Sequence, residues 1–381
     1  MTPKKIVVIN QVRGEASTHL RSGIMQYVRE RGGLQIDFHS TDEAAHMVDF
    51  FHFANYDGII SEVFNREIAL KLKDKGLPIV DLSGEMTDDP EFISIDCDVG
   101  EIARLAAERF IERGFTNFAY YGFVGSQFNK DLHNAFAARL AKEGHGCSDF
   151  SFDRKHYKES YSRFGEWLSS LPQKTAVLCL SDWWATDILH RSLAMGRAVP
   201  DDIAIMGLGN DVTKCNCTLI PISSIDPNLH GLGYAAMRTL ESAITHPVMP
   251  KRRPVFRVPP TGIVERESTA SYPVNPPWLA KALSLLDADA SRPPSVEDLA
   301  QAAGVSQPTL QAAIQDAFGM SAAKYIMTSK MRKAKQLVNG GELSVKEIAF
   351  KLGFSSPSYF SRIFREFYGR TPSGDRHPSG K

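Results

Sequence analysis

The sequence contains few cysteines and no long apolar run. Its 381 residues include five cysteines, an odd number, whose spacing matches neither a C-x-x-C pair nor a zinc-ligand framework. The cysteines are therefore expected to be reduced thiols, as in cytoplasmic proteins. No apolar run approaches the length of a membrane-spanning helix, and the short run near the N-terminus is too brief for a signal peptide. We predict a cytoplasmic protein with no membrane partner.

A net charge is also absent, because 44 Lys and Arg residues balance 44 Asp and Glu residues. The balance conceals an asymmetry. Residues 324–381 contain twelve basic and four acidic residues, a net of +8, so the preceding 323 residues carry −8. A basic end on an acidic body indicates either a polyanionic partner for that end or a solvated helix surface. Composition alone leaves both alternatives open.

Over the first 270 residues, short β-rich runs alternate with amphipathic stretches. The run KKIVVIN is typical of a strand, and the next stretch has Leu20, Ile24, Tyr27 and Val28 at helical spacing. Repeated alternation of this kind predicts parallel sheets with helical crossovers, and the number of units favours two α/β lobes with a cleft between them.

The composition changes at the proline-rich segment TASYPVNPPWL, beyond which only helical patterns follow. We expect three segments: a ligand-sensing domain at 1–270, a linker at 271–277 and an all-α DNA-binding domain at 278–378.

The helical part repeats itself at an offset of 49 residues. Gly304 matches Gly353, and both fall where a short helix should end in a left-handed conformation. Ser306 and Ser355 are predicted to cap the helix that follows, with a proline in its first turn. Such a pair of short helices is a helix-turn-helix motif, and the sequence contains two copies of it.

In a helix-turn-helix, the second helix enters the major groove of double-stranded DNA and its first turn meets bases and phosphates. We expect Ile363, Phe364 and Phe367 to face the core of the second unit. The alternative is helical packing without DNA contact. The residues predicted to contact DNA are Ser306, Gln307, Thr309, Gln311, Ser355, Ser356, Ser358, Tyr359, Arg362 and Arg365.

Residues 292–377 resemble the AraC/XylS-type DNA-binding domain, in which a long helix joins two helix-turn-helix units. The resemblance is closest in IAFKLGFSSPSYFSRIFREFYGRTP, and it implies a linking helix at 322–338. The first unit departs from the family pattern, because Ala312 and Gln315 stand where an Arg and a Lys are usual. That recognition helix should therefore hold phosphate less strongly.

The segments ISIDCDVGEIARLAAERFIERGFTNFAYYG, DWWATDILHRSLAMGRAVPDDIAIMGLGND and PPTGIVEREST resemble the effector domain of LacI/GalR-type regulators, which is itself similar to periplasmic sugar-binding proteins. An effector domain placed before an AraC-type domain is typical of a small group of xylose-responsive regulators. The resemblance implies a sugar in the cleft. On matching positions, the expected effector-binding residues are Asn10, Gln11, Phe123, Asp131, Asp182, Trp183 and Asn210.

Several of these assignments have alternatives. Asp182 could instead cap the helix that follows it, and the aromatic residues could be ordinary lobe-interface residues. Two further positions depart from the family, because Gly209 and Leu132 stand where sugar-binding Asp and Arg residues are usual. Asp131, Lys130 or Asp211 could take their place.

The resemblance implies a homodimeric transcription activator that is controlled by xylose or another sugar. The alternative is a DNA-binding regulator whose α/β domain is a ligand-free dimerisation scaffold. The sequence has no G-x-G-x-x-G, P-loop or G-x-S-x-G motif. We therefore expect no cofactor, no metal and no enzymatic activity.

Overall fold

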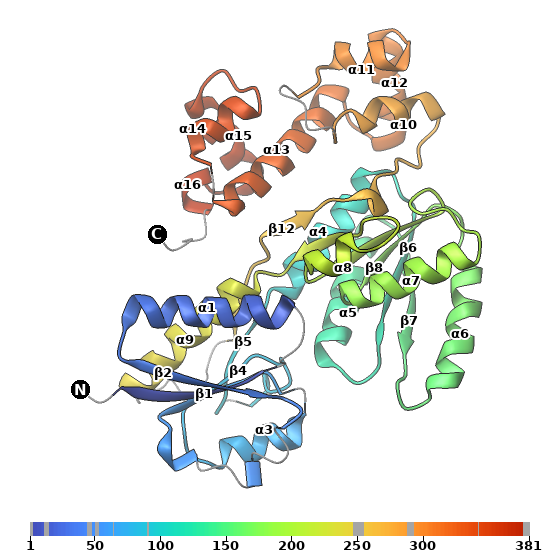
Figure 1. Cartoon of the computed structure of the whole chain (residues 1–381). Helices are drawn as coiled ribbons and strands as arrows, with labels where there is room; N and C mark the ends of the chain where they lie inside the picture. The colour runs from blue at the N-terminus through green and yellow to red at the C-terminus, as the bar shows by residue number, and fades with distance from the viewer. Residues whose placement is uncertain are drawn as a thin grey trace.

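The computed structural model describes residues 3–10, 15–43, 48–49, 53–63, 65–89, 91–246, 255–287, 293–341 and 343–375. Two six-stranded sheets form two lobes, and a helical region follows them (Figure 1). The expected fold class is confirmed. Among the described helices, none is long and apolar enough to cross a membrane.

The first lobe contains a parallel sheet in the order β11-β5-β4-β3-β1-β2. Helices α1 and α9 cover one face and α3 lies on the other (Figure 1). The strands are β1 (Lys4–Asn10), β2 (Leu34–Ser40), β3 (Gly58–Ser61), β4 (Ile79–Asp81), β5 (Ile93–Cys97) and β11 (Phe256–Val258), and the helices are α1 (Glu15–Arg31), the 3-10 turn Phe53–Asn55, α3 (Arg66–Lys73) and α9 (Leu229–Thr245).

The second lobe has the order β12-β10-β9-β8-β6-β7, and only β12 runs antiparallel to its neighbour. Its strands are β6 (Asn117–Phe123), β7 (Ser148–Phe152), β8 (Thr175–Cys179), β9 (Ile203–Leu208), β10 (Ser223–Asp226) and β12 (Gly262–Val264), and its helices are α4 (Val99–Glu112), α5 (Gln127–Ala141), α6 (Tyr157–Ser170), α7 (Asp182–Ala194), α8 (Val212–Asn216) and the 3-10 turn Glu267–Thr269. The chain passes between the lobes three times, from β5 to α4, from β10 to α9 and from β11 to β12.

Helices α1 and α9 pack unusually closely in the first lobe, because a glycine of each lies against the backbone of the other. A Cβ atom added at Gly23 would lie 1.9 Å from the carbonyl oxygen of His230, and one at Gly233 would lie 2.1 Å from that of Leu20. Only glycine allows this approach, so the two helices are fixed relative to each other.

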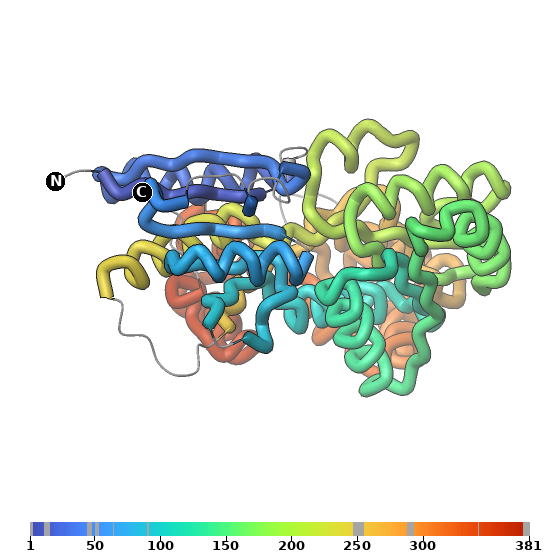
Figure 2. Tube along the Cα trace, turned by 90° about the horizontal axis from the view of Figure 1, so that it is seen from below, coloured from blue at the N-terminus to red at the C-terminus, as the bar shows by residue number. Residues whose placement is uncertain are grey.

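The helical region has two apolar cores that share one long helix. The core of the first unit includes Leu310 and Ile314, and that of the second includes Phe360 and Phe364. The helices are α10 (Pro277–Ser284), α11 (Val296–Ala303), α12 (Gln307–Phe318), α13 (Ala322–Gly340), α14 (Val345–Lys351), α15 (Pro357–Tyr368) and α16 (Pro372–Asp375). Helix α13 contributes residues to both cores. Figure 2 shows that the helical region lies behind both lobes.

The structure corrects the alignment of the repeat. Gly304 and Gly353 end the first helix of each unit in left-handed conformations, as predicted. Ser306 caps α12, but α15 is capped by Ser356 and not by Ser355. The turn of the second unit is one residue longer, so the second helices correspond at an offset of 50. Leu310 and Ile314 therefore match Phe360 and Phe364.

A related prediction about the second core was also wrong. Phe364 is fully buried and Ile363 is half-buried against the same core. Phe367, however, is 42% exposed: helical spacing places it on the same side as Phe360 and Phe364, but it lies in the last turn of α15 and is not part of this core.

Candidate functional site

Two strands of the first lobe end in a buried polar residue, and a third strand carries one near its start. Strand β3 ends at Ser61 and β4 at Asp81, and the register pairs Ser61 with Asp81 and Asp81 with Ser94 of β5. The three side chains therefore form a row across neighbouring strands. All three are buried, and the hydroxyls of Ser61 and Ser94 have no hydrogen-bond partner among the residues that the structure describes. Burying such groups without a partner is costly, so this row is suited to a hydroxyl-rich ligand.

Asn10 ends β1 at the same edge, where it was predicted to bind the effector. Its Oδ1 accepts hydrogen bonds from Nε and Nη2 of Arg21 at 3.1 and 3.0 Å. Its amide nitrogen is buried and has no hydrogen-bond partner in the described part of the chain. Gln11, the other residue predicted after this strand, lies outside the described residues.

Two carboxyl groups at this edge have raised pKa values. Burial raises the pKa of Asp81, and the hydrogen bonds donated by Ser83 lower it by a smaller amount. Burial raises the pKa of Asp96 to about 6, and the carboxylates of Asp81 and Asp131 contribute in the same direction. Asp131 belongs to α5 of the second lobe, so the two lobes are close here.

A hydrogen bond joins the lobes at the same place. The backbone N–H of Gln127 donates to Oε1 of Glu85 at 3.1 Å, and Nε2 of Gln127 donates to Asp131 at 2.9 Å. Glu85 follows the carboxyl end of β4 and Gln127 follows that of β6. The bond therefore sets the carboxyl edges of the two sheets opposite each other.

The second lobe places a polar cluster at its own carboxyl edge. Asp182 is only 2% exposed, and its two oxygens accept from Oγ of Ser224 at 2.5 Å and from the backbone N–H of Asp211 at 2.7 Å. Burial raises its pKa. Asn210 is linked to the same Ser224, whose Oγ accepts from its backbone N–H at 2.9 Å. The Asn210 side chain accepts from Arg266 at 2.9 Å.

Asp182 does not cap the helix that follows it, because Ser181 occupies the N-cap of α7. Asp182 instead holds the loop after β9. Gly209 in that loop has φ +126°, and a Cβ atom there would lie 3.2 Å from Oδ2 of Asp182. Leu132, the other departure from the family pattern, is fully buried in the core.

An aromatic group lies beside this cluster. Phe123 ends β6 and stacks on Trp184, with ring centroids 6.0 Å apart. Trp183 meets Trp184 edge to face at 4.8 Å and is 55% exposed. The guanidinium of Arg154 lies 4.6 Å from the Phe123 ring. The aromatic residues thus offer a flat apolar face with a cation above it.

The residues that sequence reasoning missed are Ser61, Asp81, Ser94, Asp96 and Arg154. For Ser61, Asp81 and Asp96, the signal was a polar residue at or near the end of a short apolar strand, as in GIIS, IVD and ISID; Ser94 lies near the start of its strand and gave no such signal. Arg154 gave no signal, because its position over Phe123 depends on the fold.

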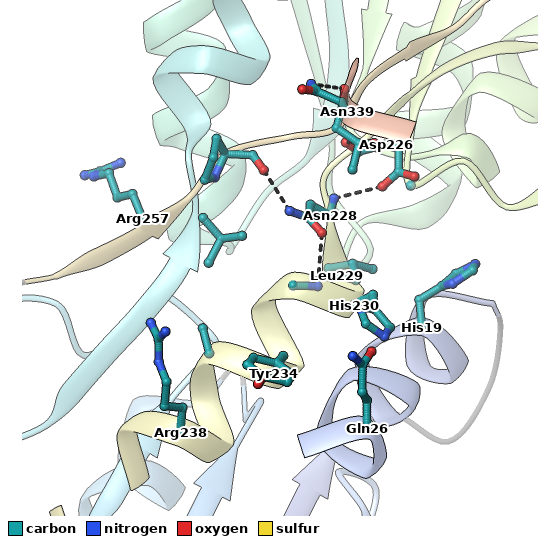
Figure 3. A pocket seen from close by; sticks show the side chains of 16 residues that line it. His19, Gln26, Asp226, Asn228, Leu229, His230, Tyr234, Arg238, Arg257 and Asn339 are labelled. Carbon is teal, nitrogen blue, oxygen red and sulfur yellow. Dashed lines mark hydrogen bonds between the residues drawn. The ribbon is translucent and has the colours of Figure 1, made fainter. Parts of the chain in front are cut away.

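A pocket of about 390 Å³ lies where the first lobe, the interlobe crossovers and the helical region meet (Figure 3). Asn228, the N-cap of α9, organises one wall. It accepts from the backbone N–H of Gly231 at 3.0 Å and donates to the carbonyl oxygen of Pro259 at 3.2 Å. Its backbone N–H donates to Asp226 at 2.8 Å. Asn339 of α13 lines the same pocket, so a helix of the DNA-binding region borders the crossovers.

A buried ionic network fastens the helical region to the second lobe. Arg109 of α4 and Arg113, the C-cap of the same helix, are 2% and 1% exposed. Both donate to Oε2 of Glu265, which follows β12, at 2.5 and 2.7 Å, and both also pair with Asp287 after α10. Nε of Arg332 in α13 lies 3.4 Å from Glu265. The arginines hold the pKa of Glu265 well below its usual range, although burial alone would raise it.

Helix α13 also binds the backbone of the third crossover. The side-chain amide of Gln336 donates to the carbonyl oxygen of Ile263 at 2.6 Å, and that of Asn339 donates to the carbonyl oxygen of Thr261 at 2.5 Å. The helix that joins the two helix-turn-helix units is therefore held directly on β12 and the segment before it.

The predicted DNA-contacting residues of the first unit divide into two groups. Gln307 is exposed in the first turn of α12. The hydroxyl of Ser306 accepts from the backbone N–H of Thr309, and the two hydroxyls lie 2.8 Å apart. Gln311, however, accepts from the backbone N–H of Ala322 at 3.0 Å, so its side chain caps α13.

In the second unit, Ser355, Ser358 and Arg365 are exposed. Ser356 accepts from the backbone N–H of Tyr359. Arg362 donates to Glu366 at 3.1 Å, and its guanidinium lies 5.2 Å from the Tyr359 ring. The contacts of all these residues with DNA stay predictions.

Two family models match the chain: the periplasmic binding protein-like domain over residues 107–269 and the helix-turn-helix domain over residues 299–377. The xylose operon regulatory protein of Escherichia coli (strain K12) is 25% identical over 325 residues, which cover 83% of this chain and 82% of that protein. Its counterpart in Haemophilus influenzae is 23% identical over 359 residues, 92% of both chains.

Solved structures agree on the fold. A xylose-binding transcription activator matches over 99% of both chains, with a TM-score of 0.62 and 22% identity. A transcriptional regulator in complex with cellobiose matches over 70% of this chain and 86% of its own, with a TM-score of 0.59 and 17% identity.

Fold and matches together define the class: this is a DNA-binding transcription regulator in which a periplasmic-binding-protein-like domain precedes an AraC-type helix-turn-helix domain. Within that class, the chain is a homologue of the xylose operon regulatory proteins. Both predicted resemblances are thereby confirmed.

Proposed function

We propose that the chain is a cytoplasmic transcription activator whose first domain binds a small sugar, xylose or a related compound, between its lobes. The observation that carries this proposal is the row of Ser61, Asp81 and Ser94, which are buried and include two hydroxyls without partners. Sugar hydroxyls would supply those partners. The names of the similar proteins, which refer to xylose and cellobiose, support a sugar as the ligand class.

The second lobe would complete the site. Its carboxyl edge is held opposite the polar row by the Glu85–Gln127 hydrogen bond. Phe123 and Trp183 would lie against the C–H surface of the sugar ring, and Asn10 would donate its free amide N–H from the first lobe.

The response would pass to DNA through the second lobe. Helix α13 and the arginine network attach the DNA-binding region to that lobe and to the third crossover. Rotation of the lobes about the crossovers would therefore move the two DNA-binding helices as one body with the second lobe. In a homodimer, this motion would change the placement of two DNA-binding regions. The sugar must bind one arrangement more tightly than the other for this to work.

Thermal unfolding of the full chain with pentoses, hexoses and sugar acids tests the ligand. A sugar at a hundredfold excess over its Kd should stabilise the protein by about 2.7 kcal/mol. Asp81→Asn should abolish the shift, whereas the matched exposed variant Asp74→Asn should retain it. A panel that produces no shift would contradict the proposal.

The second candidate is a DNA-binding regulator whose first domain is a ligand-free dimerisation scaffold. The observation that favours it is the state of Asp182, whose two oxygens are already satisfied within the protein. The burial of Leu132 in the core points the same way. An absence of any sugar-induced shift, together with intact dimerisation, is the result that this candidate predicts.

A further inference from the structure

The two helix-turn-helix units differ in charge by five. The first unit, α11 and α12 with their turn (residues 296–318), contains three acidic residues and no Lys or Arg, a net of −3. The second, α14 and α15 (residues 345–368), contains four basic and two acidic residues, a net of +2. Of the two units, the second must therefore supply most of the attraction to phosphate, since phosphate neutralisation by Lys and Arg dominates the salt-dependent part of DNA binding.

The structure shows which side chains of α12 are free to meet DNA. Leu310 and Ile314 are fully buried, so the opposite side of the helix presents Pro308, Ala312 and Gln315, all exposed. Gln311 is not available, because its side-chain oxygen binds the first backbone N–H of α13.

The corresponding side of α15 has the opposite character. At an offset of 50, Ser358, Arg362 and Arg365 are exposed opposite the buried Phe360 and Phe364. Two cations thus stand where α12 presents a methyl group and an amide. Both helices have the same length and are followed by a glycine at the C-cap. The two helices therefore differ in their exposed side chains and not in their backbone.

The chemistry of the free α12 residues favours one kind of base pair. A glutamine amide can donate from Nε2 to N7 of adenine and accept at Oε1 from the adenine N6 amino group, and an alanine methyl group packs against the thymine methyl group. We propose that α12 determines sequence at A·T pairs through Gln315, Ala312 and Gln307, while α15 supplies most of the charge-dependent affinity. This inference rests on the proposed function, because it takes DNA binding by the chain as given.

The assignment places sequence preference on α12 and the salt dependence of binding on α15, whereas a single recognition helix would determine both. Changes in α12 that keep its charge should alter which sequence is preferred at constant salt dependence. Changes in α15 should alter the salt dependence by about one unit of slope for each lost phosphate contact, with little change in preference.

The test uses the full chain, an operator selected from random double-stranded DNA, and binding measured over a salt series. Gln315→Ala should leave the slope unchanged and reduce discrimination at one A·T pair by about 5- to 150-fold. Ala312→Lys should steepen the slope by about one unit and strengthen binding to all sequences. Arg362→Ala should lower the slope by about one unit at every sequence. All three positions are exposed, and thermal unfolding of each variant confirms that the fold is kept.

Three results would overturn the assignment. If Gln315→Ala and Ala312→Lys change neither slope nor preference while Arg362→Ala weakens binding, α12 does not lie on DNA, although the proposed function stands. If Gln315→Ala relaxes preference at a G·C pair, the base class is wrong. If the wild-type chain selects no DNA at all, the proposed function itself fails.

Discussion

Replacing Glu265 with glutamine removes the one carboxylate that Arg109, Arg113 and Arg332 share. Its Oε2 accepts from the first two at 2.5 and 2.7 Å, and those two side chains are almost completely buried. Breaking a buried ion pair by neutralising one partner costs about 3–5 kcal/mol, and Asp287, which still pairs with Arg109 and Arg113, offsets part of that cost. Whole domains are stable by only about 5–15 kcal/mol. We therefore expect Glu265→Gln to release the DNA-binding region from the second lobe well before global unfolding.

Urea unfolding at pH 7, followed by tryptophan fluorescence and circular dichroism, measures this loss. Glu267→Gln is the matched control, because Glu267 is two residues away, exposed and outside the network; it should change the free energy of unfolding by less than about 0.5 kcal/mol. Equal effects of the two substitutions would refute the structural role of the network.

The pH dependence of the same pair of proteins gives an independent check. The pKa of Glu265 is depressed in the folded state from its ordinary value of 4.5. Its contribution is therefore fully present above pH 4.5 and is lost as the pH falls toward the folded-state pKa. The difference in stability between wild type and Glu265→Gln should shrink as the pH is lowered below 4.5. A constant difference would contradict the assignment.

Three further predictions follow from local geometry. Burial raises the pKa of Asp96 from 3.8 to about 6, so wild-type stability falls as pH rises between these values; Asp96→Asn should remove that loss and add on the order of 3 kcal/mol at pH 7 in a urea titration. Gly233→Ala should cost about 1–3 kcal/mol by calorimetry because its Cβ meets the α1 backbone, whereas Gly165→Ala, in open space, should stabilise α6. Gln311→Ala should lower stability by about 0.5–1.5 kcal/mol without changing the salt slope of DNA binding. The Asp96 prediction is contradicted if Asp96→Asn leaves the pH profile of stability unaltered, and the glycine prediction if both glycine changes have equal effects. A changed salt slope of DNA binding in Gln311→Ala would contradict the third.

The fold class could be predicted because its signals are local. Strand and helix periods, the proline-rich segment before α10, and the glycines at 304 and 353 are each visible within a few residues. The error in the repeat has an equally local cause. Ser355 and Ser356 both suit an N-cap, and only the backbone shows that Phe354 and Ser355 together fill the longer turn.

The candidate site was harder to predict because it depends on strand register. Ser61, Asp81 and Ser94 are ordinary polar residues in the sequence and become a row only when β3, β4 and β5 pair. The interdomain network was invisible for a similar reason. Arg109 lies on the amphipathic helix α4 and Arg113 directly after it, where charged residues usually face water, and only the docked α13 and the segment after β12 bury them.

The central claim is that a sugar in the first domain changes DNA binding by the last. The most direct test is the fluorescence anisotropy of a labelled, selected operator titrated with the full chain, with and without the sugar that shifts thermal unfolding. We predict that saturating sugar changes the operator Kd at least fivefold, and that operator changes the sugar Kd by the same factor, as linkage requires. An operator Kd that is unchanged by a sugar that demonstrably binds would contradict the account.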